Sequence, residues 1–240
     1  MSVLRTLTAI MLLLLASGHF AAVHAEEFAR GTWGTVLRYN YGFVMAHREA
    51  LMPLQEQHLQ ALEFSVFNTS AGQKAWQRKF LYPETGVLLS WTNTGTAKLG
   101  SAIGVIPYVD FPLFKSNDNQ SWLRYGMGLG YIQYPFDPTK NQKNAAIGSH
   151  WNGAVHLGWS YRKNFSTKTV GEIGASLTHF SNGSMKMPNL GINLPAVNIG
   201  IRHYFGATPH LVTTRDSTTR RTGTIHVFGA YGRKEIYPAL

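Results

Sequence analysis

The sequence predicts an all-β fold: an antiparallel, up-and-down transmembrane β-barrel of about eight strands, followed by a C-terminal extension. Segments of roughly 8 to 15 residues, long enough for a membrane-spanning strand, alternate between bulky apolar and small or polar side chains. Glycine and aromatic residues are abundant (Gly 24, Tyr 11, Phe 13, Trp 6), as in barrels with tight turns and aromatic girdles. Hydrophobic residues make up 44% of the chain, yet no apolar run beyond residue 25 is long enough for a spanning helix.

The first 25 residues predict a secretory signal peptide. Arg5 precedes an apolar run at residues 10–16, and Val23-His24-Ala25 offers small residues for cleavage after Ala25. A single transmembrane helix is the weaker interpretation, because the apolar run is too short to span a bilayer. The chain has no cysteine, which excludes disulfides, a cysteine-linked lipid anchor and cysteine-based catalysis. We therefore expect export, with residues 26–206 forming a barrel in the cell outer membrane.

Eight segments carry the strand pattern, and an even number of strands can close a small barrel. They are Trp33–His47, Gln55–Asn68, Gly86–Asn93, Gly100–Pro112, Trp122–Tyr134, Asn152–Lys163, Lys168–Ser181 and Gly191–Phe205. An apolar face opposite a small or polar face is typical of a lipid-facing wall around a polar lumen. A soluble lipocalin-like barrel would turn the apolar face inward. Alternation alone does not separate the two, but the aromatic strand ends and the glycines favour the membrane barrel.

The lengths of the connections predict the orientation of the barrel. The short link Lys163–Lys168 fits the periplasmic side, whereas the longer polar links Asp137–Trp151 and Asn182–Leu190 fit the outer side. If both termini are periplasmic, the strand Lys168–Ser181 runs outward. His150, in one of the longer links, could position a substrate, but a solvated loop side chain is the favoured interpretation.

A His-x-Ser pair ends the strand Lys168–Ser181. Successive side chains of a strand point to opposite faces, so His179 and Ser181 share the apolar face. The returning strand places Asn193 at the same end and on the same face. Polar groups in a lipid-facing wall are costly unless they are satisfied, which suggests a functional site. Polar residues just above the hydrocarbon would be ordinary, and periodicity leaves both interpretations open.

Two short motifs and their spacing resemble a known family. They are His179-Phe180-Ser181-Asn182 and Pro188-Asn189-Leu190-Gly191-Ile192. They match the pattern His-aromatic-Ser-Asn, a short linker and Pro-Asn-x-Gly-Ile of the PagL-type lipid A 3-O-deacylases, a family of outer-membrane esterases. The resemblance implies an eight-stranded barrel over about Trp33 to Phe205. It also implies removal of an ester-linked acyl chain from lipid A without a metal or another cofactor.

The resemblance also implies roles for single residues. By position, Ser181 is the nucleophile and His179 the general base that takes the hydroxyl proton. Asn189 corresponds to a residue implicated in the oxyanion hole, where an amide N–H stabilises the tetrahedral oxyanion. Asn182 is a weaker candidate for the same role.

The chain departs from the family at the third catalytic position. The best-known members place Glu two residues after the motif glycine, where this chain has Asn193. An amide oxygen can orient an imidazole, as in Cys-His-Asn proteases, but it supplies no negative charge. Glu172 lies on the opposite strand face, and Glu84 or Asp137 could approach His179 only through loops. We therefore expect Asn193 to orient the histidine. The alternative is a non-catalytic barrel with a structural or binding role.

The formal net charge of +10 predicts an anionic partner. Nucleic acid is a poor candidate outside the cytoplasm. The phosphates of lipopolysaccharide, with its lipid A, or anionic outer-membrane phospholipids fit better, although a solvated basic surface would also explain the charge. The sequence gives no indication of the oligomeric state.

Residues 207–240 do not fit the eight-strand scheme. A polar, basic stretch at residues 208–222 precedes a strand-like segment, Thr224–Tyr231, that would be a ninth strand. A ninth strand would leave an odd count or an unpaired edge. Either this extension folds outside the barrel, or the chain is truncated relative to a larger parent.

Overall fold

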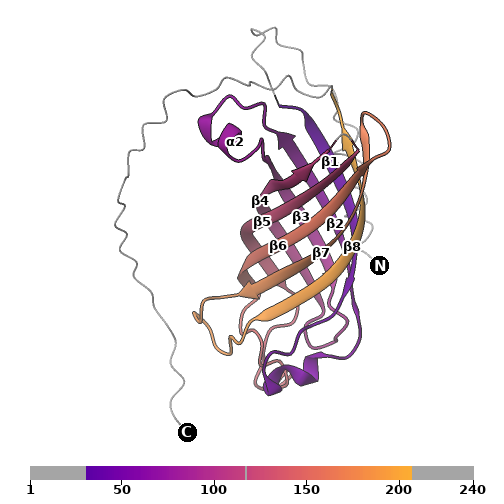
Figure 1. The fold of residues 1–240 in the computed structure, drawn as a ribbon. Helices are drawn as coiled ribbons and strands as arrows, with labels where there is room; N and C mark the ends of the chain where they lie inside the picture. Colours follow the sequence, from indigo (N-terminus) through magenta and orange to yellow (C-terminus); the bar gives the residue numbers. More distant parts are fainter. Residues whose placement is uncertain (1–30, 117, 207–240) are drawn as a thin grey trace.

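The structure, a computed structural model, describes residues 31–116 and 118–206. Within them the chain forms a closed barrel in which each strand pairs antiparallel with the next and the last pairs with the first (Figure 1). The predicted fold class is confirmed. The predicted signal peptide and the C-terminal extension lie outside the described residues, so both stay predictions.

All eight predicted strands are present. They are β1 (Trp33–Gly42), β2 (Leu59–Thr69), β3 (Glu84–Asn93), β4 (Ser101–Lys115), β5 (Asn119–Ile132), β6 (Trp151–Asn164), β7 (Thr169–Ser181) and β8 (Ile192–Tyr204). Two short helices were not predicted: the 3-10 helix η1 (Glu49–Leu54) and α2 (Ala75–Lys79). Because η1 occupies the β1–β2 connection, β2 begins four residues later than its predicted start at Gln55.

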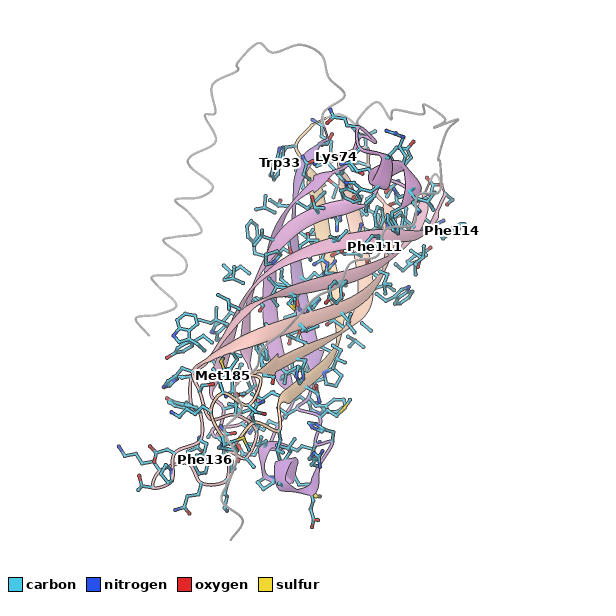
Figure 2. The ribbon with its side chains drawn as sticks, turned by 90° about the vertical axis from the view of Figure 1, so that its left-hand side faces the viewer. Trp33, Lys74, Phe111, Phe114, Phe136 and Met185 are labelled. Carbon is cyan, nitrogen blue, oxygen red and sulfur yellow. The ribbon has the colours of Figure 1, made fainter. Side chains whose placement is uncertain are left out.

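Large apolar side chains cover the outside of the barrel. Leu129 of β5 and Ile199 of β8, for example, are 63% and 62% exposed, whereas Arg124, on the other face of β5, is buried. Figure 2 shows side chains projecting from the wall along the whole barrel, with Trp33 and Phe114 near one end and Met185 near the other. This arrangement excludes the inverted, lipocalin-like alternative and fits a wall that contacts lipid.

Ion pairs occupy the lumen, mostly toward the barrel end that carries the β2–β3 and β6–β7 connections. Among the described residues, four buried arginines and four buried carboxylates form one network; they are Arg38, Arg124, Arg162, Arg202, Glu63, Glu84, Asp110 and Glu172. The bonds include Arg124 Nε to Asp110 Oδ1 at 2.7 Å. Such pairs must be well satisfied, because a buried charge without a partner is strongly destabilising. The lumen is therefore polar, as predicted, and is occupied by side chains.

The barrel end next to the β7–β8 connection is closed by an apolar cap. We define the cap as Val44, Leu51, Leu54, Leu99, Ile132, Ile147, Phe180 and Ile192, all buried in one cluster. η1 supplies two of these side chains, which explains why a short helix is stable there although no side-chain hydrogen bond caps its start. The cap holds together the connections β1–β2, β3–β4, β5–β6 and β7–β8, which lie at the same end (Figure 1).

An ion pair ties two of these connections together. Glu56 of the β1–β2 connection pairs with the Lys98 ammonium of the β3–β4 connection and accepts a bond of 3.0 Å from the Ala97 amide. Hydrogen bonding, chiefly from Lys98, lowers the pKa of the Glu56 carboxyl to about 2. Its contribution is therefore present at neutral pH and is lost only as the pH falls through that value.

The connection lengths follow the prediction with one exception. The turns at residues 116–118 and 165–168 are short and lie at the end opposite the cap. The β2–β3 connection, residues 70–83, lies at that same end but is long, because it contains α2 (Figure 1). Within residues 31–116 and 118–206, no helix is long and apolar enough to cross a membrane.

Candidate active site

The candidate site lies on the outer wall where β7 and β8 meet the apolar cap. Strand alternation sends Phe180 into the barrel, where it is 1% exposed, and this leaves His179 and Ser181 on the outward face. The register places Asn193 of β8 directly opposite His179. The predicted grouping of these three residues on one face is therefore present in the structure.

Asn193 binds the ring of His179. Its Oδ1 lies 2.7 Å from Nδ1 of the histidine, and both side chains are half-buried. An amide oxygen is only an acceptor, so the proton of a neutral ring resides on Nδ1. Nε2 then carries a lone pair and has no hydrogen-bond partner among the described residues. This is the tautomer that a general base needs.

Ser181 is held by two N–H donors. Asn189 Nδ2 donates to its Oγ at 2.9 Å, and the backbone amide of Gly183 donates at 3.2 Å. In the part of the chain that the structure describes, no hydrogen bond joins Ser181 to His179. Contacts between a nucleophile and its base often tighten only when substrate binds. Both donors therefore lie beside the hydroxyl oxygen of Ser181.

The side chain of Asn182 binds two loops rather than Ser181. Its Nδ2 donates to Ser149 Oγ and to the Lys186 carbonyl, both at 2.8 Å, and its backbone amide donates to Asn189 Oδ1 at 3.1 Å. Both side-chain donors are therefore engaged within the loops. Asn189 Nδ2 and the Gly183 amide donate to Ser181 Oγ, whereas the Asn182 side chain binds elsewhere; the backbone donor was not predicted from the sequence.

The motif glycine makes room for the histidine. Gly191 has a φ of +81°, in the left-handed region that glycine occupies without strain. A Cβ atom built there would lie 2.7 Å from Cε1 of His179, so any side chain would push against the ring. The Gly191 amide also donates to the Ala146 carbonyl at 2.9 Å, which packs the β5–β6 connection against the site loop.

None of the three carboxylates considered from the sequence contacts His179. Glu172 and Glu84 lie inside the barrel and bind arginines there. Asp137 accepts hydrogen bonds from its own loop, through Oδ1 at 2.7 to 2.8 Å. Asn193 is thus the group that the fold brings to Nδ1 of the histidine.

Three other histidines lie at this end of the barrel, and one of them, His58, binds the Gly42 carbonyl through Nδ1 at 3.2 Å. His150 binds the Ile132 carbonyl through Nδ1 at 2.9 Å and stacks on Tyr131. His47, which sequence reasoning missed, accepts a bond from Asn193 Nδ2 at 3.0 Å. Its position at the outer end of the first predicted strand, on the apolar face, is the same signal that identified His179.

Comparisons with known proteins agree with the motifs. The sequence model of the family described as "Lipid A 3-O-deacylase (PagL)" matches residues 62–202, more than half of the chain. No curated protein sequence matches the chain. Neisserial surface protein A (NspA) is similar in structure, with a TM-score of 0.52 and 8% identity over 72% of this chain and 97% of that one, which shows the fold alone.

The outer membrane enzyme PagL is also similar, with a TM-score of 0.47 and 14% identity. That match covers 69% of this chain and 97% of the PagL chain. The match to the family model extends from β2 to β8 and includes both motifs of the site. The resemblance found in the sequence is confirmed: this chain belongs to the lipid A 3-O-deacylase (PagL) family.

Proposed function

We propose that this protein is an outer-membrane serine esterase that removes the 3-O-linked acyl chain from lipid A. Ser181 is the nucleophile, His179 the general base and Asn193 the residue that orients the base. The observation that carries the proposal is the 2.7 Å contact between Asn193 Oδ1 and His179 Nδ1. It leaves Nε2 free as a proton acceptor two residues from a serine that already lies among N–H donors.

The reaction follows from these roles. Ser181 Oγ attacks the ester carbonyl carbon while His179 Nε2 takes the hydroxyl proton. Asn189 Nδ2 and the Gly183 amide donate to the oxyanion that forms. The bond to the sugar oxygen then breaks, and His179 returns the proton to that oxygen. Water, activated by the same histidine, hydrolyses the acyl-serine and releases the fatty acid.

The outward face suits a substrate that is itself a membrane lipid. Below the site, Ile173 of β7 pairs with Ile199 of β8, and both are exposed on the outer wall. Acyl chains of a bound lipid can pack against this surface. With periplasmic termini, the site lies at the outer leaflet, where lipopolysaccharide resides, and the net charge of +10 favours its phosphates.

Mass spectrometry of lipid A tests the proposal. Membranes of a strain that expresses the protein are expected to contain lipid A lacking one hydroxyacyl chain, whereas membranes with Ser181→Ala should retain it. Heat-modifiable gel mobility confirms that both proteins are folded. Unchanged lipid A in the presence of folded wild-type protein would refute the assignment, and release of fatty acid from phospholipid alone would redirect it to a phospholipid esterase.

A non-catalytic structural or binding barrel is the second candidate. The observation in its favour is that Ser181 and His179 share no hydrogen bond in the part of the chain that the structure describes. Phenotypes of the wild-type protein that persist in the Ser181→Ala variant would support this role.

Asn193→Ala is expected to lower turnover by roughly a hundredfold, within the range that general-base catalysis contributes. The alanine leaves the His179 ring without an orienting acceptor, while the half-buried site of Asn193 on the outer wall lies outside the barrel core. Asn193→Glu should keep or raise activity, because a carboxylate supplies the same acceptor together with negative charge. Rates on purified lipid A in detergent measure both effects. Full activity of Asn193→Ala would show that another group orients the base.

A further inference from the structure

We propose that His47 is a positioning residue: it fixes the orientation of the Asn193 amide and thereby the proton position on His179. The inference rests on the proposed function, in which His179 acts as the base. His47 lies in the β1–β2 connection, 146 positions from Asn193 in the sequence. Within the described part of the chain, no hydrogen bond joins it to Ser181 or to the two donors at Ser181 Oγ. It acts through Asn193.

A chain of hydrogen bonds runs from the Leu190 carbonyl through His47 and Asn193 to His179, and the carbonyl fixes which atoms donate. Leu190 O can only accept, so Nε2 of a neutral His47, 3.1 Å away, carries the proton and donates. Nδ1 of His47 is then a lone-pair acceptor, and it lies 3.0 Å from Asn193 Nδ2, which donates to it. The amide oxygen must therefore face His179 Nδ1 at 2.7 Å, which fixes the tautomer with a free Nε2.

An amide at this position needs such a partner, whereas a carboxylate does not. A carboxylate presents an acceptor to His179 in either rotamer of its terminal bond. An amide rotated by half a turn would present Nδ2 instead, and His179 would then carry its proton on Nε2. A protonated Nε2 of a neutral ring cannot accept the proton of Ser181. Because this chain has Asn193 where the best-known family members have Glu, its activity depends on His47, which selects one orientation of the amide.

Hydrogen bonds to the residues just before His47 hold this part of the chain in place. Pairing between β1 and β8 continues past the end of β1, because the Met45 amide donates to the Asn193 carbonyl at 2.9 Å. Gln55 Nε2 donates to the Val44 carbonyl at 2.9 Å and so secures the start of the connection. His47 itself is exposed, so its replacement leaves no cavity in the apolar cap.

A double-mutant cycle tests the inference. His47→Ala is expected to lower kcat on lipid A by about tenfold in the Asn193 enzyme, within the range for residues in contact, and by less than about twofold in the Asn193→Glu enzyme. His203→Ala, an exposed histidine at the opposite end of β8, is the matched control and should leave kcat unchanged. An equal loss in both backgrounds, or no loss in the Asn193 enzyme, would overturn the inference.

A measurement without turnover separates this inference from the proposed function. Nitrogen-15 spectra of histidine-labelled protein in detergent should show His179 protonated at Nδ1 in the wild type. His47→Ala should give a mixture of tautomers, and addition of Asn193→Glu should restore the Nδ1–H form. A His179 tautomer that does not respond to His47→Ala overturns the positioning role. The expected change in a protein that does not cleave lipid A supports the positioning role and refutes the esterase assignment.

Discussion

Ser181→Ala is expected to lower the rate of lipid A deacylation by roughly ten-thousand-fold or more, and additional replacement of His179 is expected to have no further effect. The base acts only by taking the proton of the nucleophile, so it has nothing to do once that hydroxyl is gone. The donors that remain, Asn189 Nδ2 and the Gly183 amide, should sustain a small residual rate.

Single-turnover rates on purified lipid A measure this non-additivity. The set consists of Ser181→Ala, His179→Ala and the double variant, with Ser121→Ala as a matched control. Ser121 accepts a bond of 2.9 Å from the Trp159 indole on the outer wall of β5 and β6, away from the site. If the two single losses multiplied in the double variant, Ser181 and His179 would not act as one unit, and the mechanism proposed above would be wrong.

The barrel could be predicted from the sequence because alternation decides the face of every strand side chain. One residue of slip would turn each apolar side chain into the lumen, so the pattern fixes both the strands and their outward surface. The helices η1 and α2 carry no comparable signal. η1 depends on Leu51 and Leu54 entering the apolar cap, and that cap forms only when four connections meet.

In the candidate site too, the strand residues could be predicted from the sequence and the loop groups could not. Strand parity predicts that His179, Ser181 and Asn193 share a face, and the structure brings His179 and Asn193 into direct contact. Two features depend on loop conformation: the Gly183 amide, which reaches Ser181 through a backbone φ of +64°, and His47. Their positions follow from how the chain turns between strands, which strand periodicity does not determine.

Asp110→Ala is expected to destabilise the barrel by about 3 to 5 kcal/mol, the usual effect of removing one partner from a buried ion pair. Asp110 is fully buried and binds Arg124 through two bonds, at 2.7 and 2.9 Å, besides contacting Arg162 and Arg202. Its loss leaves three buried guanidinium groups with one carboxylate fewer, and water in the filled lumen can replace it only in part.

Unfolding by guanidinium chloride in lipid vesicles, followed by tryptophan fluorescence, measures this loss of stability. Asp118→Ala, an exposed aspartate in the turn between β4 and β5, is the matched control and should change stability by less than about 0.5 kcal/mol. Equal stability of the two variants would mean that the interior ion pairs contribute little to the free energy of unfolding.

The folded fraction of Asp110→Ala should retain its specific activity on lipid A, because the ion-pair network lies inside the barrel and the candidate site lies on the outer wall. A folded but inactive Asp110→Ala protein would instead show that the ion-pair network positions the candidate site. The connection would be β7, because its Glu172 belongs to the network and its His179 and Ser181 face outward.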